Sequence, residues 1–240
     1  KTAEGRKIRK AFIASPNHFI FSVDYSQVEL RILAHVANVD SLLNAFHKNE
    51  DIHSVTAMDV FQVDKASLNS DLRRKAKTIN FGIIYGISPY GLSAQLDISN
   101  SEAKQYIESY FKKYPGIKEY MDKTVKDCRS KGYVATPFGR RIFIPFINDK
   151  VANRRNFAER SAINAPIQGG AADLIKLTMP KIYEFLINQK LLSKMLIQVH
   201  DELIFEVPQN EIKIMKENIP EIMTNSHKNF LYLDVPIKVD

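Results

Sequence analysis

The sequence has a single cysteine, Cys128, among 240 residues. One thiol cannot form an internal disulfide, which excludes a disulfide-stapled secreted domain and is typical of a reducing compartment. No run of eighteen apolar residues predicts a membrane-spanning helix, and the basic start lacks the apolar stretch of a signal peptide. We therefore expect an unexported protein with no membrane partner.

Internal repeats and low-complexity linkers are also missing, and 45% of the residues are hydrophobic. A chain of this length and composition buries a substantial core, as one large domain or as two closely joined lobes. The net charge of +7 comes from 34 Lys and Arg against 27 Asp and Glu. This modest excess permits a polyanionic partner without requiring one.

Hydrophobic periodicity predicts an α+β fold. A β-type run at 19–23 leads into an amphipathic helix at 28–37, and further helical patterns follow. These further helices are expected at 52–61, 71–85, 101–114 and 116–131. Alternating apolar residues return in a late hairpin around residue 200. We expect the first strand and this hairpin to share one antiparallel sheet, with a large helical insertion between them.

Two prolines interrupt the helical pattern between residues 153 and 188. Proline lacks the backbone N–H of a helix and its ring clashes with the preceding turn. Pro166 therefore predicts the end of one helix, and Pro180 predicts a kink or a split near Met179 in the next.

Three polar residues, His200, Asp201 and Glu202, lie at the centre of the otherwise apolar hairpin. Two-residue hairpin loops favour Asn-Gly or Asp-Gly because glycine accepts a positive φ, and no glycine occurs here. We infer that something other than turn formation selected these residues. If the first strand and the hairpin are neighbours, Asp24 at the end of that strand lies close to Asp201.

Two adjacent carboxylates repel each other, and one protonates unless cations lie between them. Magnesium needs only one or two carboxylates and completes its coordination with water and phosphate oxygens. Two such ions about 4 Å apart stabilise both the attacking and the leaving oxygen of a phosphoryl displacement. Asp24 and Asp201 are thus candidate ligands of two Mg²⁺ ions, although each alone is as well explained as a turn or cap residue.

A segment of helical pattern carries two cations and two aromatic rings on one face. Arg73, Lys77, Phe81 and Tyr85 recur every four residues, a spacing that drifts by about 40° per step on an α-helix. The cations suit a triphosphate and the rings suit a base. The alternative for the stripe alone is an ordinary amphipathic helix, solvated in its first half and buried in its second.

Three segments, "DYSQVELRILAH", "RRKAKTINFGIIYG" and "QVHDELIFE", occur in this order. They resemble motifs A, B and C of the family A, or DNA polymerase I-like, DNA polymerases. The resemblance covers essentially the whole sequence, since intervening segments such as "ERSAINAPIQGGAADLIK" are also similar to that family. Three long motifs together are far more specific than one short pattern.

This resemblance implies a palm domain whose antiparallel sheet carries the catalytic carboxylates, with a large helical fingers domain inserted into it. We expect residues 1–50 and 151–240 to form the first and second parts of the palm, and residues 51–150 to form the fingers. The chain resembles a fragment that starts after the thumb and stops short of the family's C-terminal segment. The thumb and any exonuclease domain would lie outside it.

The resemblance also implies template-directed DNA synthesis in replication and repair. In that reaction a primer 3′-hydroxyl attacks the α-phosphate of a dNTP, two Mg²⁺ ions stabilise the charge, and pyrophosphate leaves. Primer–template DNA and dNTPs are the expected partners of a monomeric cytoplasmic protein, nucleoid-associated in a bacterium; an organellar origin is not excluded. A truncated, inactive primer–template-binding fragment and a related single-subunit RNA polymerase remain as alternatives.

Site roles follow from the residues that match the family's motifs. Asp24, Asp201 and the backbone carbonyl of Tyr25 match the metal ligands. Glu202 matches an auxiliary acidic residue, and Lys77 matches the nucleotide-binding cation that would protonate the departing pyrophosphate. The other nucleotide-binding matches are Arg73, Phe81, Tyr85, His53, Glu29 and Gln27. The DNA-binding matches are Arg160, Asn164, Gln168 and His200.

Glu29 has two interpretations. Ser26 followed three residues later by Glu29 is a capping-box pattern, which makes Glu29 structural. The resemblance makes Glu29 the steric gate that excludes a ribose 2′-hydroxyl. We favour the gate because Glu29 lies within motif A, and this role argues against the RNA polymerase alternative.

Overall fold

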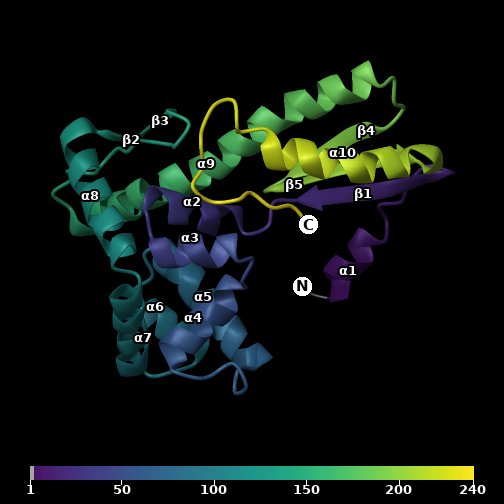
Figure 1. Ribbon diagram of the computed structural model, residues 1–240. Coiled ribbons are helices and arrows are strands. Elements are labelled where there is room, and N and C mark those ends of the chain that lie inside the picture. Colours follow the sequence, from purple (N-terminus) through teal and green to yellow (C-terminus); the bar gives the residue numbers. More distant parts are fainter. Residues whose placement is uncertain (1–2) are drawn as a thin grey trace. The chain divides into compact units, whose positions relative to one another are not determined.

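The computed structural model describes residues 3–240, which fold into helices and two small antiparallel sheets (Figure 1). The strands are β1 (His18–Asp24), β2 (Tyr133–Ala135), β3 (Arg141–Phe143), β4 (Lys194–Val199) and β5 (Glu202–Pro208). The helices are α1 (Ala3–Arg9), α2 (Val28–Val36), α3 (Asp40–His47), α4 (Ile52–Phe61), α5 (Ser70–Ile84), α6 (Pro89–Leu96), α7 (Asn100–Lys113), α8 (Pro115–Lys131), α9 (Ala152–Asn188), the 3₁₀ turn η1 (Gln209–Glu211) and α10 (Ile212–Asn225). The predicted α+β class is confirmed.

Most predicted elements are present within one or two residues of their expected bounds, because local signals define their ends. Asn69 caps α5 by accepting from the backbone N–H groups of Asp71 and Leu72 at 3.1 and 2.9 Å. Ser99 and Glu102 form a capping box at the start of α7. The short helices α3 and α6 were not predicted individually.

Helix α9 is continuous from Ala152 to Asn188, so the predicted end at Pro166 and the predicted split near Met179 were wrong. The alternative of a kink at Pro180 stays a prediction. Proline has no backbone N–H, so Pro166 leaves the carbonyl oxygen of Ala162 without its usual donor. The Tyr120 hydroxyl donates to the carbonyl oxygen of the next residue, Ile163, at 3.1 Å and so binds the helix at this turn. Ala162 and Ile167 on either side of Pro166 are fully buried. Tertiary packing and this side-chain donor therefore outweigh the local cost of the proline, about 3 kcal/mol.

The chain divides into two compact units. The first comprises Lys1–Val28, Ala171–Tyr232 and Ile237–Asp240, and contains the three-stranded sheet. The second comprises Glu29–Gly170 and Leu233–Pro236, and contains α2 to α8 and the β2–β3 hairpin. The assignment of residues to palm and fingers stays a prediction.

In the first unit the strand order is β1–β5–β4, and all pairs are antiparallel. The expected pairing of the first strand with the late hairpin is therefore present. Helix α10 contacts β1 and β5 and runs alongside them (Figure 1). Leu203, Phe205 and Val207 alternate along β5 and are fully buried, as expected for one face of a strand. From α10, the fully buried residues are Met215, Ile219 and Met223.

In the second unit α4 packs against α5 and α7, and α6 packs against both α5 and α7 (Figure 1). Helix α5 buries Ala76, Ile79 and Ile84 completely. A separate apolar cluster joins α8, the β2–β3 hairpin and the start of α9, and Cys128 is a buried member of it. This packing leaves the polar face of α5 outside the core.

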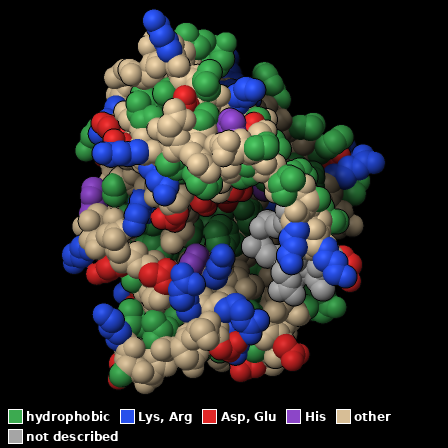
Figure 2. All heavy atoms as spheres, turned by 90° about the vertical axis from the view of Figure 1, so that its right-hand side faces the viewer, with side chains coloured by type: hydrophobic (Ala, Val, Ile, Leu, Met, Phe, Trp, Pro, Cys, Tyr) green, Lys and Arg blue, Asp and Glu red, His purple; other side chains and the backbone are tan. Residues whose placement is uncertain are grey.

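The surface has no strongly segregated charge on the face drawn in Figure 2, where Lys and Arg side chains are interspersed with acidic and neutral ones. This distribution agrees with the modest net charge of +7. Within residues 3–240, no helix combines the length and the apolar character needed to cross a membrane.

The Glu211 side chain binds the segment just before β4, and its contribution to stability can be tested. Its buried carboxylate accepts from the backbone N–H groups of Leu192 and Ser193, both at 2.9 Å, and from the Ser193 hydroxyl at 2.6 Å. Glu211→Ala should lower the free energy of unfolding by about 2–3 kcal/mol, because two backbone donors lose a charged acceptor. Urea unfolding measures this loss. The exposed Glu217→Ala on α10 is the matched control, and an equal loss in both variants would contradict the assignment.

Candidate functional site

Four acidic residues converge at the end of β1 in the first unit. Asp24 is the last residue of β1 and pairs with Glu202 in the β1–β5 ladder. The next backbone N–H, that of Tyr25, donates to the carbonyl oxygen of Asp201 at 3.1 Å. Asp24 and Asp240 also exchange two backbone hydrogen bonds, at 3.1 and 2.9 Å. Asp240 was not among the predicted site residues. The only sign of its position in the sequence is the run of β-type residues at 233–239 that precedes it.

The electrostatics of this group favour a bound cation. Partial burial, followed by the charges of Asp201, Asp240 and Glu202, raises the pKa of Asp24 above its ordinary value. Within residues 3–240, no three His, Cys, Asp or Glu side chains are already arranged to enclose a metal. Hard carboxylate oxygens in an incomplete set fit Mg²⁺, which takes its remaining ligands from water and substrate.

The backbone around these carboxylates is unusual at two non-glycine residues. The β4–β5 loop is His200–Asp201, and His200 has a φ of 56°. Gln27, just after β1, has a φ of 52°. Positive φ is uncommon for residues with a side chain and is concentrated at functional sites. The side-chain oxygen of Gln27 is also buried with no hydrogen-bond partner in the described part of the chain.

Tyr25 is anchored by its side chain. The ring is only 1% exposed, its hydroxyl donates to the Met223 carbonyl at 2.9 Å, and it also pairs with the Thr178 hydroxyl at 2.6 Å. Burial raises the pKa of Tyr25 to about 12, against the opposing effect of hydrogen bonds with Thr178 and Ser226. The Tyr25 backbone, which contacts Asp201, is thus held from the interior.

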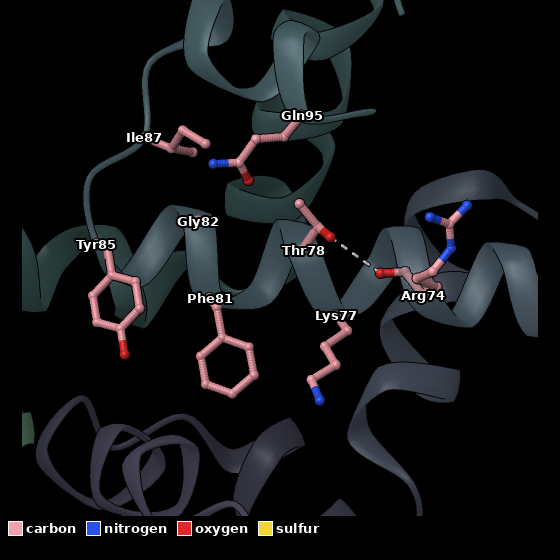
Figure 3. A pocket seen from close by; sticks show the side chains of 8 residues that line it. All are labelled: Arg74, Lys77, Thr78, Phe81, Gly82, Tyr85, Ile87 and Gln95. Carbon is pink, nitrogen blue, oxygen red and sulfur yellow. Dashed lines mark hydrogen bonds between the residues drawn. The ribbon is translucent and has the colours of Figure 1, made fainter. Parts of the chain in front are cut away.

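In the second unit, the polar stripe lies along α5. Lys77, Phe81 and Tyr85 point to the same side of the helix, whereas Gly82 faces Ile87 on the other side (Figure 3). The rings of Phe81 and Tyr85 are stacked, with centroids 6.3 Å apart. A Cβ on Gly82 would lie 3.0 Å from an Ile87 side-chain carbon. Gly82 therefore allows the Ile87 side chain to approach this helix closely. A pocket of about 430 Å³ is lined by Arg74, Lys77, Thr78, Phe81, Gly82, Tyr85, Ile87 and Gln95.

Arg73 is held by a carboxylate that sequence analysis missed. Its Nε and Nη2 atoms donate to the two oxygens of Asp51 at 2.6 and 3.1 Å. Asp51 also caps α4 by accepting from the Ser54 N–H at 3.2 Å. Burial acts to raise the pKa of Asp51, but hydrogen bonds from Arg73 and Ser54 outweigh it and the pKa is lowered. In the sequence, Asp51 could have been recognised only as an N-cap residue, because it directly precedes the helical pattern of α4.

His53 lies beside the same cations. The residue is only 3% exposed, and its ring is 5.8 Å from that of Phe81. Burial lowers the pKa of His53 to about 4; the charge of Asp51 opposes this shift, and those of Arg73 and Lys77 reinforce it. His53 is therefore neutral near pH 7.

Glu29 and Tyr85 meet directly. The Tyr85 hydroxyl donates to Glu29 Oε2 at 2.5 Å. Burial and then the Glu29 carboxylate raise the pKa of Tyr85 to about 12, so Tyr85 remains a proton donor at physiological pH. Glu29 lies in the first turn of α2. Its two predicted roles, in capping this helix and in excluding a ribose 2′-hydroxyl, both stay predictions.

Because α9 continues through Pro166, the i+4 spacing of Arg160, Asn164 and Gln168 places them on one helical face. Gln168 hydrogen-bonds the Tyr85 side chain. The Arg160 stem lies against Gly86, where a Cβ would come within 2.8 Å of it and where φ is 70°. The side-chain oxygen of Asn164 is buried and has no partner among the described residues.

Comparison with known proteins identifies the family, because the model for DNA polymerase family A matches residues 1–240. The chain belongs to DNA polymerase family A. It is 49% identical over 238 residues to DNA polymerase I of Geobacillus stearothermophilus, covering 99% of this chain and 27% of that protein. It is 50% identical over 242 residues to DNA polymerase I of Rhizobium leguminosarum, covering 100% of this chain and 24% of the relative. The predicted resemblance is confirmed.

A solved structure of the same family is also similar. It is described as the POL domain of Pol1 from M. smegmatis in complex with DNA primer-template and dNTP. The TM-score is 0.93 at 40% sequence identity, and the match covers 100% of this chain and 42% of that one. The chain thus spans about a quarter of the length of the curated relatives and less than half of this structural relative.

The low pKa of His53 predicts a pH dependence of stability in this family A chain. Below its ordinary value of 6.5 the unfolded histidine binds a proton, whereas the folded one stays neutral until about pH 4. The free energy of unfolding should therefore fall with decreasing pH, by about 1.4 kcal/mol per unit for this group between about pH 6 and 4.5. In His53→Gln this contribution should be missing. Denaturant titrations across this range compare the two proteins, and parallel pH profiles would refute the assignment.

Proposed function

We propose that this chain performs the nucleotidyl-transfer step of a DNA-directed DNA polymerase. A primer 3′-hydroxyl attacks the α-phosphate of a dNTP, and pyrophosphate is released. The observation that carries this proposal is the convergence of Asp24 and Asp201, through β1, β5 and the bond from Tyr25, in a chain of DNA polymerase family A. The DNA and dNTP named for the structural relative support the same substrates here.

Asp24, Asp201 and the carbonyl of Tyr25 are the proposed ligands of two Mg²⁺ ions. When bound, the ions would supply charge stabilisation at the attacking and leaving oxygens. The two aspartates supply negative oxygens at one end of the sheet, and Glu202 adds a further negative charge there. Burial, and after it the charges of Asp201, Asp240 and Glu202, raise the pKa of Asp24, and a bound cation would offset both effects, which supports this role.

Binding of the triphosphate is assigned to Arg73, Lys77 and His53. Arg73 is held in place by Asp51 and has further N–H donors for phosphate oxygens. Lys77 is exposed on the same helix and would give its proton to the leaving pyrophosphate. Phe81 and Tyr85 would contact the sugar and base of the nucleotide, and Gln27 would be a further nucleotide contact.

Glu29 is assigned the selection of deoxyribose. Its carboxylate is held by Tyr85, so its side chain does not rotate freely. A ribose 2′-hydroxyl would meet this fixed pair, whereas a 2′-deoxyribose would leave room. The capping interpretation of Glu29 is compatible with this role.

Primer–template DNA is the proposed macromolecular partner. Arg160, Asn164 and Gln168 would contact minor-groove acceptors that all correct base pairs present, and His200 would lie by the primer end. We further assign residues 1–50 and 151–240 to the palm, residues 51–150 to the fingers, and the protein to replication and repair as a monomer. Its bacterial relatives favour a place in the cytoplasm at the nucleoid.

Asp201→Asn tests the metal assignment, because it removes one charge at nearly constant volume. Nucleotide incorporation by the complete polypeptide that carries this chain should fall about a thousandfold, since several kcal/mol of charge stabilisation are lost. Primer–template affinity should be retained. Single-turnover primer extension and DNA binding measure the two effects. Asp122→Asn, on the exposed face of α8, is the matched control, and undiminished synthesis by Asp201→Asn would refute the assignment.

Glu29→Ala tests the gate. Removing the side chain should raise the relative incorporation efficiency of an rNTP over the matching dNTP by at least about tenfold, equivalent to about 1.4 kcal/mol of lost discrimination. The ratio of kcat/KM values for the two nucleotides is the readout. Because Tyr85→Phe removes the hydrogen bond but keeps the carboxylate, it should relax selectivity less. An unchanged ratio in Glu29→Ala would leave only the capping role.

A further inference from the structure

A buried polar network lies behind His53. Asn80 on α5 and Thr56 on α4 are both fully buried. The Asn80 side-chain nitrogen lies 3.1 Å from His53 Nδ1 and 3.0 Å from the Thr56 hydroxyl. Buried polar groups without partners are costly, so these contacts restrict the orientation of each side chain.

The Thr56 hydroxyl contacts both ends of the Asn80 amide. It donates to the Asn80 side-chain oxygen at 3.2 Å and accepts from the side-chain nitrogen at 3.0 Å. A hydroxyl carries one proton and two lone pairs, so it can make both contacts at once. Thr56 thus holds the amide in place.

The amide nitrogen, and not the amide oxygen, lies next to the histidine ring. Its distance to His53 Nδ1 is 3.1 Å. An amide nitrogen can only donate, so one of its N–H groups is directed to Thr56 and the other to His53 Nδ1.

The tautomer of His53 is then decided. A neutral imidazole has one N–H, and because Nδ1 accepts from Asn80, the proton is on Nε2. Within residues 3–240, Nε2 has no hydrogen-bond partner, and it is not one of the fully buried unpaired atoms. The charges of Arg73 and Lys77 act on the same ring. An accessible N–H donor beside two cations suits an anionic ligand.

We propose that Asn80, with its amide held by Thr56, is a positioning residue that keeps His53 in the Nε2–H tautomer as a donor to a phosphate oxygen of the nucleoside triphosphate. This inference rests on the proposed function and extends it to residues that do not touch the nucleotide. In the other tautomer His53 would present a lone pair to the phosphate and repel it. A histidine at this position is therefore useful only when Nδ1 is supplied with a donor.

The tautomer itself can be measured without any reaction. Long-range ¹H–¹⁵N spectra of histidine-labelled protein distinguish a protonated ring nitrogen from an unprotonated one, and His53→Gln identifies the signal among the six histidines. We expect an unprotonated Nδ1 and a protonated Nε2 in the wild type. Asn80→Asp places an acceptor at Nδ1 and should leave that nitrogen protonated. A wild-type His53 with a protonated Nδ1 would overturn the proposal.

Nucleotide binding tests the consequence. The dNTP dissociation constant of the complete polypeptide on primer–template should rise about tenfold in Asn80→Leu, the loss expected for one hydrogen bond to a charged group. Asn80→Leu introduced into a His53→Phe background should cause no further loss, because Asn80 acts only through His53. A full additional loss in that background would assign Asn80 a general structural role and refute the proposal.

A second pair of variants covers the case in which Asn80→Leu does not fold. Thr56→Val removes the hydroxyl that orients the amide and should raise the dissociation constant severalfold, whereas Thr56→Ser keeps the hydroxyl and should stay within about twofold of wild type. Equal affinities in the two variants would also refute the proposal. If the wild-type protein has the expected His53 tautomer but binds no dNTP, the proposed function is refuted, whereas the hydrogen bonds proposed among Thr56, Asn80 and His53 are not.

Discussion

The architecture of the first unit depends on holding like charges together against their mutual repulsion. Asp24 and Asp201 come from distant parts of the chain, and their backbones are connected by the hydrogen bond from Tyr25 to Asp201. The β1–β5 ladder and the buried Tyr25 ring fix this arrangement from both sides. Hydrophobic burial along β5 thus supplies the free energy that keeps the carboxylates close, and burial together with the neighbouring negative charges raises the pKa of Asp24.

The second unit follows a related principle, since its polar residues are held by a neighbour before any ligand arrives. Asp51 orients Arg73, Glu29 accepts from Tyr85, and Asn80 faces His53. Preorganised polar groups are not reoriented when charge appears, and so they stabilise it at little further cost. Such pairing supports the proposal that the cations and aromatic rings spaced along α5 form a binding site and not only a solvated helical face.

Much of the fold follows from local patterns. The alternation of β1 and β5 and the helical spacing of α5 are properties of residues close in sequence, so their elements and the polar stripe were predictable. Pro166 and Pro180 show the limit of such patterns. Their local preference for a break is real, but burial of the surrounding helix and the Tyr120 hydroxyl keep α9 continuous. These contacts come from distant segments that no local pattern contains.

The sequence by itself determined the family, the α+β class and the candidate residues for binding cations and phosphate, because these depend on residue type and spacing. Only the tertiary structure decided their partners: Asp240 beside Asp24, Asp51 beneath Arg73, and Asn80 behind His53. Hydrogen bonding and charge repulsion act over a few ångströms in space. Which groups come within that range is decided by how the core packs, and that packing joins segments far apart in the chain.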